Sequence, residues 1–174
     1  DVCSSDLLGS FEKTKLNVLE NVTPGLHTIE LNHSGNSTYS PEEVETVIDI
    51  VGSHLSKVGP SEILIVAPYN NQVNAIRRAL DAAGYHEVRV GTVDKFQGQE
   101  GMVVIVSLAC SSADDAPRGL DFLLDRNRLN VAISRGKSVC YAIYSRHLLA
   151  ASFRTIEDVR SVSRLAGLRD HRVN

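Results

Sequence analysis

The sequence has 174 residues, of which 43% are hydrophobic and 22% are charged, and this composition excludes an intrinsically disordered chain. Its length suits one domain with a substantial core, and apolar runs such as residues 63–67 are too short to cross a bilayer. The formal net charge of −3 excludes a globally basic surface, so contacts with nucleic acid would need a local patch or a partner domain.

The three cysteines, Cys3, Cys110 and Cys140, have neither paired nor metal-like spacing. The sequence therefore predicts no disulfide framework and no metal site. This pattern favours a soluble protein of the reducing cytoplasm, without a membrane partner.

The ends of the sequence differ from its middle. Residues 1–7 resemble the translation of a sequencing-library adapter, with an ordinary polar loop as an equal alternative. Because the sequence has no start Met, we expect a fragment of a longer protein. We expect residues 8–27 to be a residual linker, residues 28–167 to form one domain, and residues 168–174 to be a frayed polar tail.

The first predicted elements are a short strand over residues 28–31 and a helix that begins after Ser40. Pro41 suits the first position of that helix, and Glu43 suits the third position of a capping box. Apolar residues then recur at helical spacing until Gly59 and Pro60 end the pattern.

Predicted strands and helices alternate through the rest of the chain. Residues 63–67 are an aliphatic run typical of a strand covered on both faces, and Gly84 suits a left-handed cap after the next helix. The remaining elements are predicted strands at 88–93, 102–109 and 139–144 and predicted helices at 72–83, 127–135 and 155–166. This alternation predicts an α/β fold, with a parallel sheet and helices on both of its faces.

Two polar segments follow predicted strands, at the sheet edge where ligands of open α/β proteins collect. In the first, the ring of Tyr69 could stack on adenine and the amide of Gln72 could read a base or phosphate edge, although a turn with a helix cap is an alternative. In the second, Asp94 could cap a short helix whose third position is Gln97. Gly98 and Gly101 would let the backbone approach a phosphate or sugar closely, with an ordinary loop as the alternative.

The third polar segment is the predicted amphipathic helix over residues 127–135. Arg128 and Arg135 are seven residues apart, so two helical turns place them on one stripe. Guanidinium groups suit bidentate phosphate recognition and stabilise charge in phosphoryl transfer. A solvated basic face is the alternative. Gly136-Lys137-Ser138 has the last letters of a P-loop, but it closes a helix instead of opening one, so we exclude that motif.

Taken together and in this order, residues 68–72, 92–100 and 127–135 resemble motifs IV, V and VI of superfamily 1B helicases. This group contains the nonsense-mediated-decay helicase and the Okazaki-fragment nuclease-helicase. The residues around 116–119 and 122–123 are similar to bacterial members in which a RecB-like nuclease precedes the helicase. A departure from the pattern is Lys137, where relatives often carry Arg.

The resemblance implies a three-layer RecA-like fold of the P-loop NTPase type. ATP with Mg²⁺ would lie between this domain and a first RecA-like domain, which would bind most of the nucleotide. By the same resemblance Tyr69 and Gln72 would lie near the nucleotide, and Gly98 and Glu100 near its ribose and phosphates. Arg135 would be the arginine finger.

Three further roles follow from the resemblance. Thr92 would face the nucleic-acid backbone, Arg128 would support the finger or contact phosphate, and Gln97 would relay between the ATP cleft and the strand. The implied protein is an ATP-dependent helicase that closes two motor domains over single-stranded nucleic acid, and the subgroup favours DNA over RNA. A non-catalytic helicase-like binding module and a free-standing nucleotide-binding enzyme are the alternatives.

Overall fold

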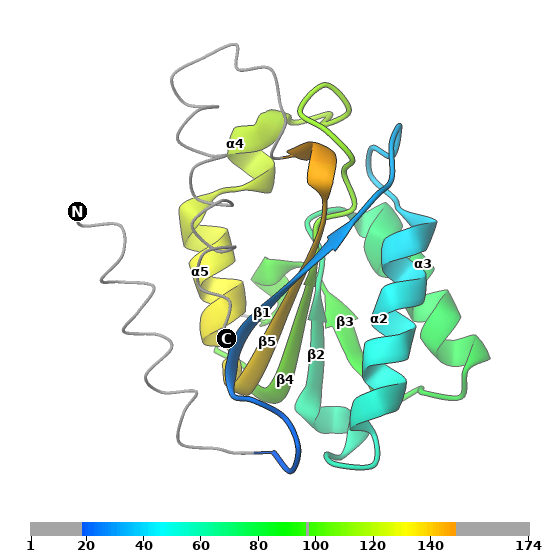
Figure 1. The fold of residues 1–174 in the computed structure, drawn as a ribbon, viewed down its shortest axis with the longest axis vertical. Coiled ribbons are helices and arrows are strands. Elements are labelled where there is room, and N and C mark those ends of the chain that lie inside the picture. The colour runs from blue at the N-terminus through cyan, green and yellow to red at the C-terminus, as the bar shows by residue number, and fades with distance from the viewer. Residues whose placement is uncertain (1–18, 97, 149–174) are drawn as a thin grey trace.

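The computed structural model describes residues 19–96 and 98–148. Its strands are β1 (Gly25–Leu31), β2 (Ile63–Val66), β3 (Arg89–Gly91), β4 (Gly101–Ser107) and β5 (Gly136–Ser145). They form one sheet in the order β1-β5-β4-β2-β3, and every pair of neighbours is parallel (Figure 1). The predicted helix over residues 155–166 lies outside the described residues.

Helices cover both faces of this sheet. Helices α2 (Pro41–His54) and α3 (Asn70–Ala82) lie on one side, and the shorter α4 (Gly119–Leu123) and α5 (Arg126–Ser134) lie on the other (Figure 1). Three-residue or four-residue 3-10 helices occupy Pro60–Glu62, Val93–Phe96 and Arg146–Leu148. The predicted α/β class and the three-layer arrangement are confirmed.

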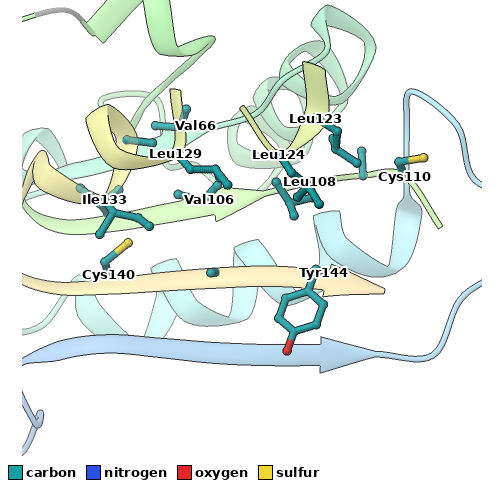
Figure 2. Packing of buried hydrophobic residues seen from close by; sticks show 14 of the residues in the cluster. Val66, Val106, Leu108, Cys110, Leu123, Leu124, Leu129, Ile133, Cys140 and Tyr144 are labelled. Carbon is teal, nitrogen blue, oxygen red and sulfur yellow. The ribbon is translucent and has the colours of Figure 1, made fainter. Parts of the chain in front are cut away.

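Alternation along the strands divides the core into two clusters. Ile63 and Ile65 of β2 pack with Val51 and Ile76 beneath α2 and α3, whereas Leu64 and Val66 face the α4 and α5 side. All four residues of β2 are buried, which explains its uninterrupted aliphatic sequence. Figure 2 shows the second cluster, where the side chains of α5 point toward the sheet. The labelled members there include Leu129, Ile133, Val106 and Cys140.

The local signals in the sequence explain where helices begin and end. Ser40 caps α2, because its Oγ accepts a hydrogen bond from the Glu43 N–H at 3.2 Å. Gly84 follows α3 with a φ of +80°, a left-handed conformation that glycine adopts without steric cost. Strand β1 starts at Gly25, three residues before the predicted strand, and Leu19 ahead of it is buried.

No helix in the described part of the chain is both long and apolar enough to span a membrane.

Candidate functional site

The predicted motif V segment is described at residues 92–96 and 98–100, and it contacts α5. It leaves the carboxyl end of β3 and returns to the amino end of β4, with the short helix Val93–Phe96 packed against α5. The Phe96 ring is buried in the same cluster as Leu129 and Ala132 of α5. The two predicted segments therefore pack together and form one surface on the α4 and α5 side of the sheet.

Thr92 and Arg128 meet at the end of this surface nearest the carboxyl ends of the strands. Both line a cavity of about 20 Å³, together with Pro68 and Phe122. A space of this size holds roughly one water. The described chain thus presents a shallow wall here and does not enclose a nucleotide-sized pocket.

The Phe122 ring holds Arg128 in place. The guanidinium carbon of Arg128 lies 4.6 Å from the ring centroid, and that of Arg118 lies 3.8 Å from it. The Asp125 carboxylate caps α5 by accepting the Arg128 N–H at 2.8 Å. The cap fixes the backbone at Arg128, and the cation–π contact fixes the direction of its side chain. Sequence reasoning missed this role of Phe122, whose only signal was an aromatic residue between two arginines.

Tyr69 also packs against this aromatic centre, with its ring centroid 5.8 Å from that of Phe122. The side chain is only 7% exposed. Burial raises the pKa of the Tyr69 phenol to about 12, with Cys110 adding to the shift and Arg118 opposing it. The phenol therefore stays neutral, and the Tyr69 ring contributes to the core beside the cavity. Its predicted place next to a nucleotide stays a prediction.

Arg135 lies at the other end of α5, as its C-cap residue. Seven residues of helix separate it from Arg128, or about 10 Å along the axis. The Arg135 Nε donates to the Val131 carbonyl at 3.1 Å, so the guanidinium group lies along its own helix. Its backbone carbonyl accepts the Gly101 N–H at 3.0 Å, which ties the end of α5 to the start of β4.

Gly98 and Glu100 are exposed and lie on the segment that leads to that junction. Gly98 has a φ of +80° and open space around the position of a side chain, so the turn itself requires glycine. The Glu100 carboxylate faces the Lys137 ammonium at 3.7 Å, and both side chains are about half exposed. Gln97 lies outside the described residues.

The glycine at position 101 is explained by packing and not by the predicted approach to a phosphate. A Cβ at this position would lie 2.7 Å from the Glu62 carbonyl oxygen, closer than atoms can pack. Close packing of β4 against the Pro60–Glu62 turn therefore requires this glycine. The short helix also begins at Val93, so Asp94 lies inside it and not at its cap.

Gln72 lies in the interior, at the amino end of α3. The Gln72 Oε1 accepts the Ser40 N–H at 2.9 Å, and the Gln72 Nε2 donates to the Ser107 Oγ at 2.9 Å. The side chain has no exposed surface. Its amide therefore joins the start of α2 to the end of β4, and any influence on a nucleotide would pass through those elements.

Glu43 is the centre of this buried polar network. One of its carboxylate oxygens accepts the Ser107 hydroxyl at 2.6 Å and the Ala109 N–H at 2.9 Å, and the other accepts the His33 Nε2–H at 3.1 Å. In a reciprocal capping box Glu43 would instead accept the Ser40 N–H, which here goes to Gln72. The predicted Ser40 cap is confirmed, but the Glu43 side chain turns inward and does not complete the capping box.

The same network contains a serine, a histidine and a carboxylate in hydrogen-bonding sequence. Ser111 Oγ lies 2.8 Å from His33 Nδ1, and His33 contacts Glu43. All three residues are buried, with exposed fractions of 0%, 3% and 0%, and Ser111 Oγ also accepts the Asn36 N–H. Since no substrate can reach the hydroxyl, this arrangement is structural and not a nucleophilic triad.

The sequence profile of a family described as AAA domain, AAA_12, matches residues 12–147. The chain belongs to this family. The C-terminal domain of a possible DNA helicase from Lactobacillus plantarum WCFS1 has a similar fold, with a TM-score of 0.51 and 17% identity, over 83% of this chain and 87% of that one.

Relatives of this AAA domain include helicases. It is 35% identical over 120 residues to RNA helicase Mov10l1 from Homo sapiens, which covers 65% of this chain and 10% of that protein. It is 42% identical over 78 residues to DNA replication ATP-dependent helicase/nuclease DNA2 from Xenopus tropicalis, covering 45% of this chain and 7% of the relative. The chain thus spans a tenth or less of the length of these two relatives. The predicted resemblance to a RecA-like C-terminal domain of superfamily 1 helicases is confirmed.

Proposed function

We propose that this AAA domain is the second motor domain of an ATP-dependent helicase and supplies one wall of an ATP site shared with a first RecA-like domain. The observation that carries this proposal is the packing of the short helix Val93–Phe96 against α5, since it brings together the two segments that resemble motifs V and VI. The exposed positions of Gly98 and Glu100 support a shared site, because a surface that faces outward needs a second domain to enclose a nucleotide.

Within that site we assign the arginine finger to Arg135 and the contacts with ribose and phosphates to Gly98 and Glu100. Gly98 supports this role by leaving open space beside its backbone. Glu100 and Arg135 lie at the same junction of β4 with α5. Arg128, held over Phe122, would support the finger or contact phosphate.

The remaining assignments concern the nucleotide base and the strand. Tyr69 would lie at the adenine, Gln72 would position the start of α3 behind it, and Gln97 would relay between nucleotide and strand. Thr92 would contact the backbone of single-stranded nucleic acid. Residues of this kind bind and orient their ligands, and the phosphoryl transfer itself would draw on the charge of the guanidinium groups.

The described part of this chain does not provide a Mg²⁺ site of its own. No group of three or more His, Cys, Asp or Glu side chains among the described residues could hold a metal ion. We therefore assign Mg²⁺, which would accompany ATP, to the first motor domain. The chain's own contribution is positive charge and backbone contacts.

The nature of the strand and the cellular setting are further proposals. Relatives named as an RNA helicase and as a DNA replication helicase/nuclease both match this domain. The bacterial subgroup resemblance favours single-stranded DNA, a RecB-like nuclease in the same protein, and a cytoplasmic location.

A steady-state ATPase assay on the 174-residue chain and on the full-length protein tests the shared site. We expect magnesium-dependent turnover from the full-length protein and none from the chain alone. Turnover by the chain alone that Arg135→Ala abolishes would support a free-standing enzyme instead. An inactive full-length protein that still binds single strands would support the non-catalytic module.

A further inference from the structure

Two grooves share Arg77 of α3, of which one lies along α3 and the other is lined mainly by residues of β3, the segment before it and the short helix Val93–Phe96. The first, of about 580 Å³, is lined by Tyr39, Asn71, Asn74, Arg77 and Arg78. The second, of about 200 Å³, is lined by Arg77, the residues from 86 to 90, Lys95, Phe96 and Gln99. We refer to the two together as the α3 track. Neither groove includes Thr92 or Arg128, so the track is separate from the cavity beside α5.

Positive charge dominates the α3 track. Among the described residues, no acidic side chain lines the first groove, and Glu87 is the one acidic residue that lines the second, beside Arg77, Arg89 and Lys95. The His86 ring also lines the second groove, and its Nδ1 lies 3.3 Å from the exposed Asp81 carboxylate beside it. In a chain whose formal net charge is −3, this local excess of cations favours an anionic ligand.

Part of this charge has a structural explanation. β3 is an edge strand, and the carbonyls of Val88 and Val90 accept hydrogen bonds from Arg77 Nη1 at 2.9 Å and from Lys95 Nζ at 3.2 Å. These bonds leave other donors of both side chains available. Arg78 is exposed on α3, and protection of the edge strand β3 does not explain its charge.

The other lining residues indicate which anion would bind. Tyr39 is 45% exposed and is the one exposed large hydrophobic residue among residues 19–96 and 98–148. Asn71, Asn74 and Arg78 lie three and four residues apart and so occupy one stripe of α3. An exposed aromatic ring beside amides and cations is the combination with which proteins bind single strands, by stacking a base and contacting phosphates.

We propose that a single strand of nucleic acid binds along the α3 track, with a base on Tyr39 and phosphates on Arg77, Arg78 and Lys95. Lys95 belongs to the short helix that directly follows Thr92, so the track leads toward the residue assigned to the strand in the motor. The choice of ligand rests on the proposed helicase function, whereas the site itself rests on the two grooves.

Fluorescence anisotropy of the 174-residue chain with labelled oligothymidine and oligouridine at several salt concentrations tests the track. The double variant Arg78→Gln with Lys95→Gln removes two phosphate contacts, so the slope of log affinity against log salt should fall by about 1.4. The matched control, Lys57→Gln with Arg146→Gln, removes two exposed cations outside the grooves and should leave the slope unchanged. Equal loss in both pairs, or no binding by the unaltered chain, would overturn the proposal.

Photocrosslinking locates the bound strand. Oligonucleotides that carry 5-iodouracil should crosslink to Tyr39, and Tyr39→Ala should lower affinity about fivefold or more through lost stacking. Polyglutamate that displaces the strand at equal charge concentration, with no crosslink at Tyr39, would mean an acidic-protein site and overturn the assignment to nucleic acid. ATP hydrolysis by the full-length protein is measured separately, so a failed track with intact ATPase activity leaves the motor function standing.

Discussion

The polar residues on the two faces of the sheet are arranged in different ways. Beneath α2 the Glu43 carboxylate accepts three hydrogen bonds inside the protein, and its partners His33 and Ser107 are buried. Beside α5 the polar groups remain partly open, since Glu100 is exposed and Arg128 lines a cavity. Both regions carry polar residues at the ends of strands, but the Glu43 network is closed to ligands by its burial, whereas the groups beside α5 are open. Removing a residue from the first should change stability, and removing one from the second should change activity.

The largest effect is expected from Arg135→Ala in the full-length protein. An arginine finger is worth ~10³–10⁵ in rate, so ATP hydrolysis should fall by a factor in that range while ATP affinity falls much less. Arg135→Lys should rescue little, because an ammonium cannot reproduce the planar fork of the guanidinium. Steady-state kinetics with thermal denaturation as a folding control measure both effects. Near-normal hydrolysis by a folded Ala variant would show that Arg135 is only a surface charge.

The second-largest effect is expected when Glu43, the centre of the buried network, is replaced by Ala. The change leaves the His33 ring, the Ser107 hydroxyl and the Ala109 N–H without their acceptor, so the free energy of unfolding should fall by at least about 3 kcal/mol. Urea denaturation of the 174-residue chain measures it. Glu45→Ala, on the exposed side of α2, is the matched control and should cost no more than about 0.5 kcal/mol. Equal losses in the two variants would contradict the role of the network.

A smaller effect is expected at Phe122, which belongs to the open region. Phe122→Leu keeps an apolar side chain but removes the ring that Arg118 and Arg128 contact, so stability should fall by about 1 kcal/mol. In the full-length protein the ATPase rate should fall as well, because Arg128 loses its support. Phe122→Tyr retains the ring and should behave like the unaltered protein in both assays. If the Leu variant has unchanged ATPase kinetics, Arg128 does not contribute to the ATP site.

The smallest effect is a pH dependence from His54, which closes α2. Burial lowers the pKa of the His54 imidazole below its ordinary value of 6.5, against a hydrogen bond with the Ile50 carbonyl that raises it, and Lys57 and His27 lower it further. The unfolded chain therefore binds the proton more tightly, and the free energy of unfolding should decrease as the pH falls below 6.5. Urea denaturation at pH 7.5 and pH 5.5 should show a smaller decrease for His54→Gln than for the unaltered chain. Identical decreases would assign the pH dependence to other groups.

Much of the fold could be predicted because its signals are local. The aliphatic run of β2, the Ser40 cap and Gly84 each depend on neighbours in the sequence, and the structure confirms all three. The role of Gly101 could not be predicted, since it depends on the Glu62 carbonyl 39 positions earlier in the numbering. Such contacts are set by strand order, which periodicity does not report.

In the candidate site, too, local features could be predicted and long-range contacts could not. Motif spacing correctly indicated a helix that carries Arg128 and a loop that carries Gly98. It could not show that the amide of Gln72 turns inward to Ser107, because amides at helix starts serve ligands and interiors equally well. The assignments of the individual residues to ATP or strand remain predictions for the experiments above.

The pairing of β1 with β5 has a consequence for synthesis on the ribosome. Gly25 pairs with Val139, so the sheet joins residues whose numbers differ by 139 − 25 = 114. At ~5–20 residues per second, β1 waits on the order of ten seconds for its partner strand. During this interval its backbone donors and acceptors are available to chaperones or to other nascent chains. Strands β2, β3 and β4 can meanwhile assemble, and β1 can join the sheet only after β5 has paired with β4.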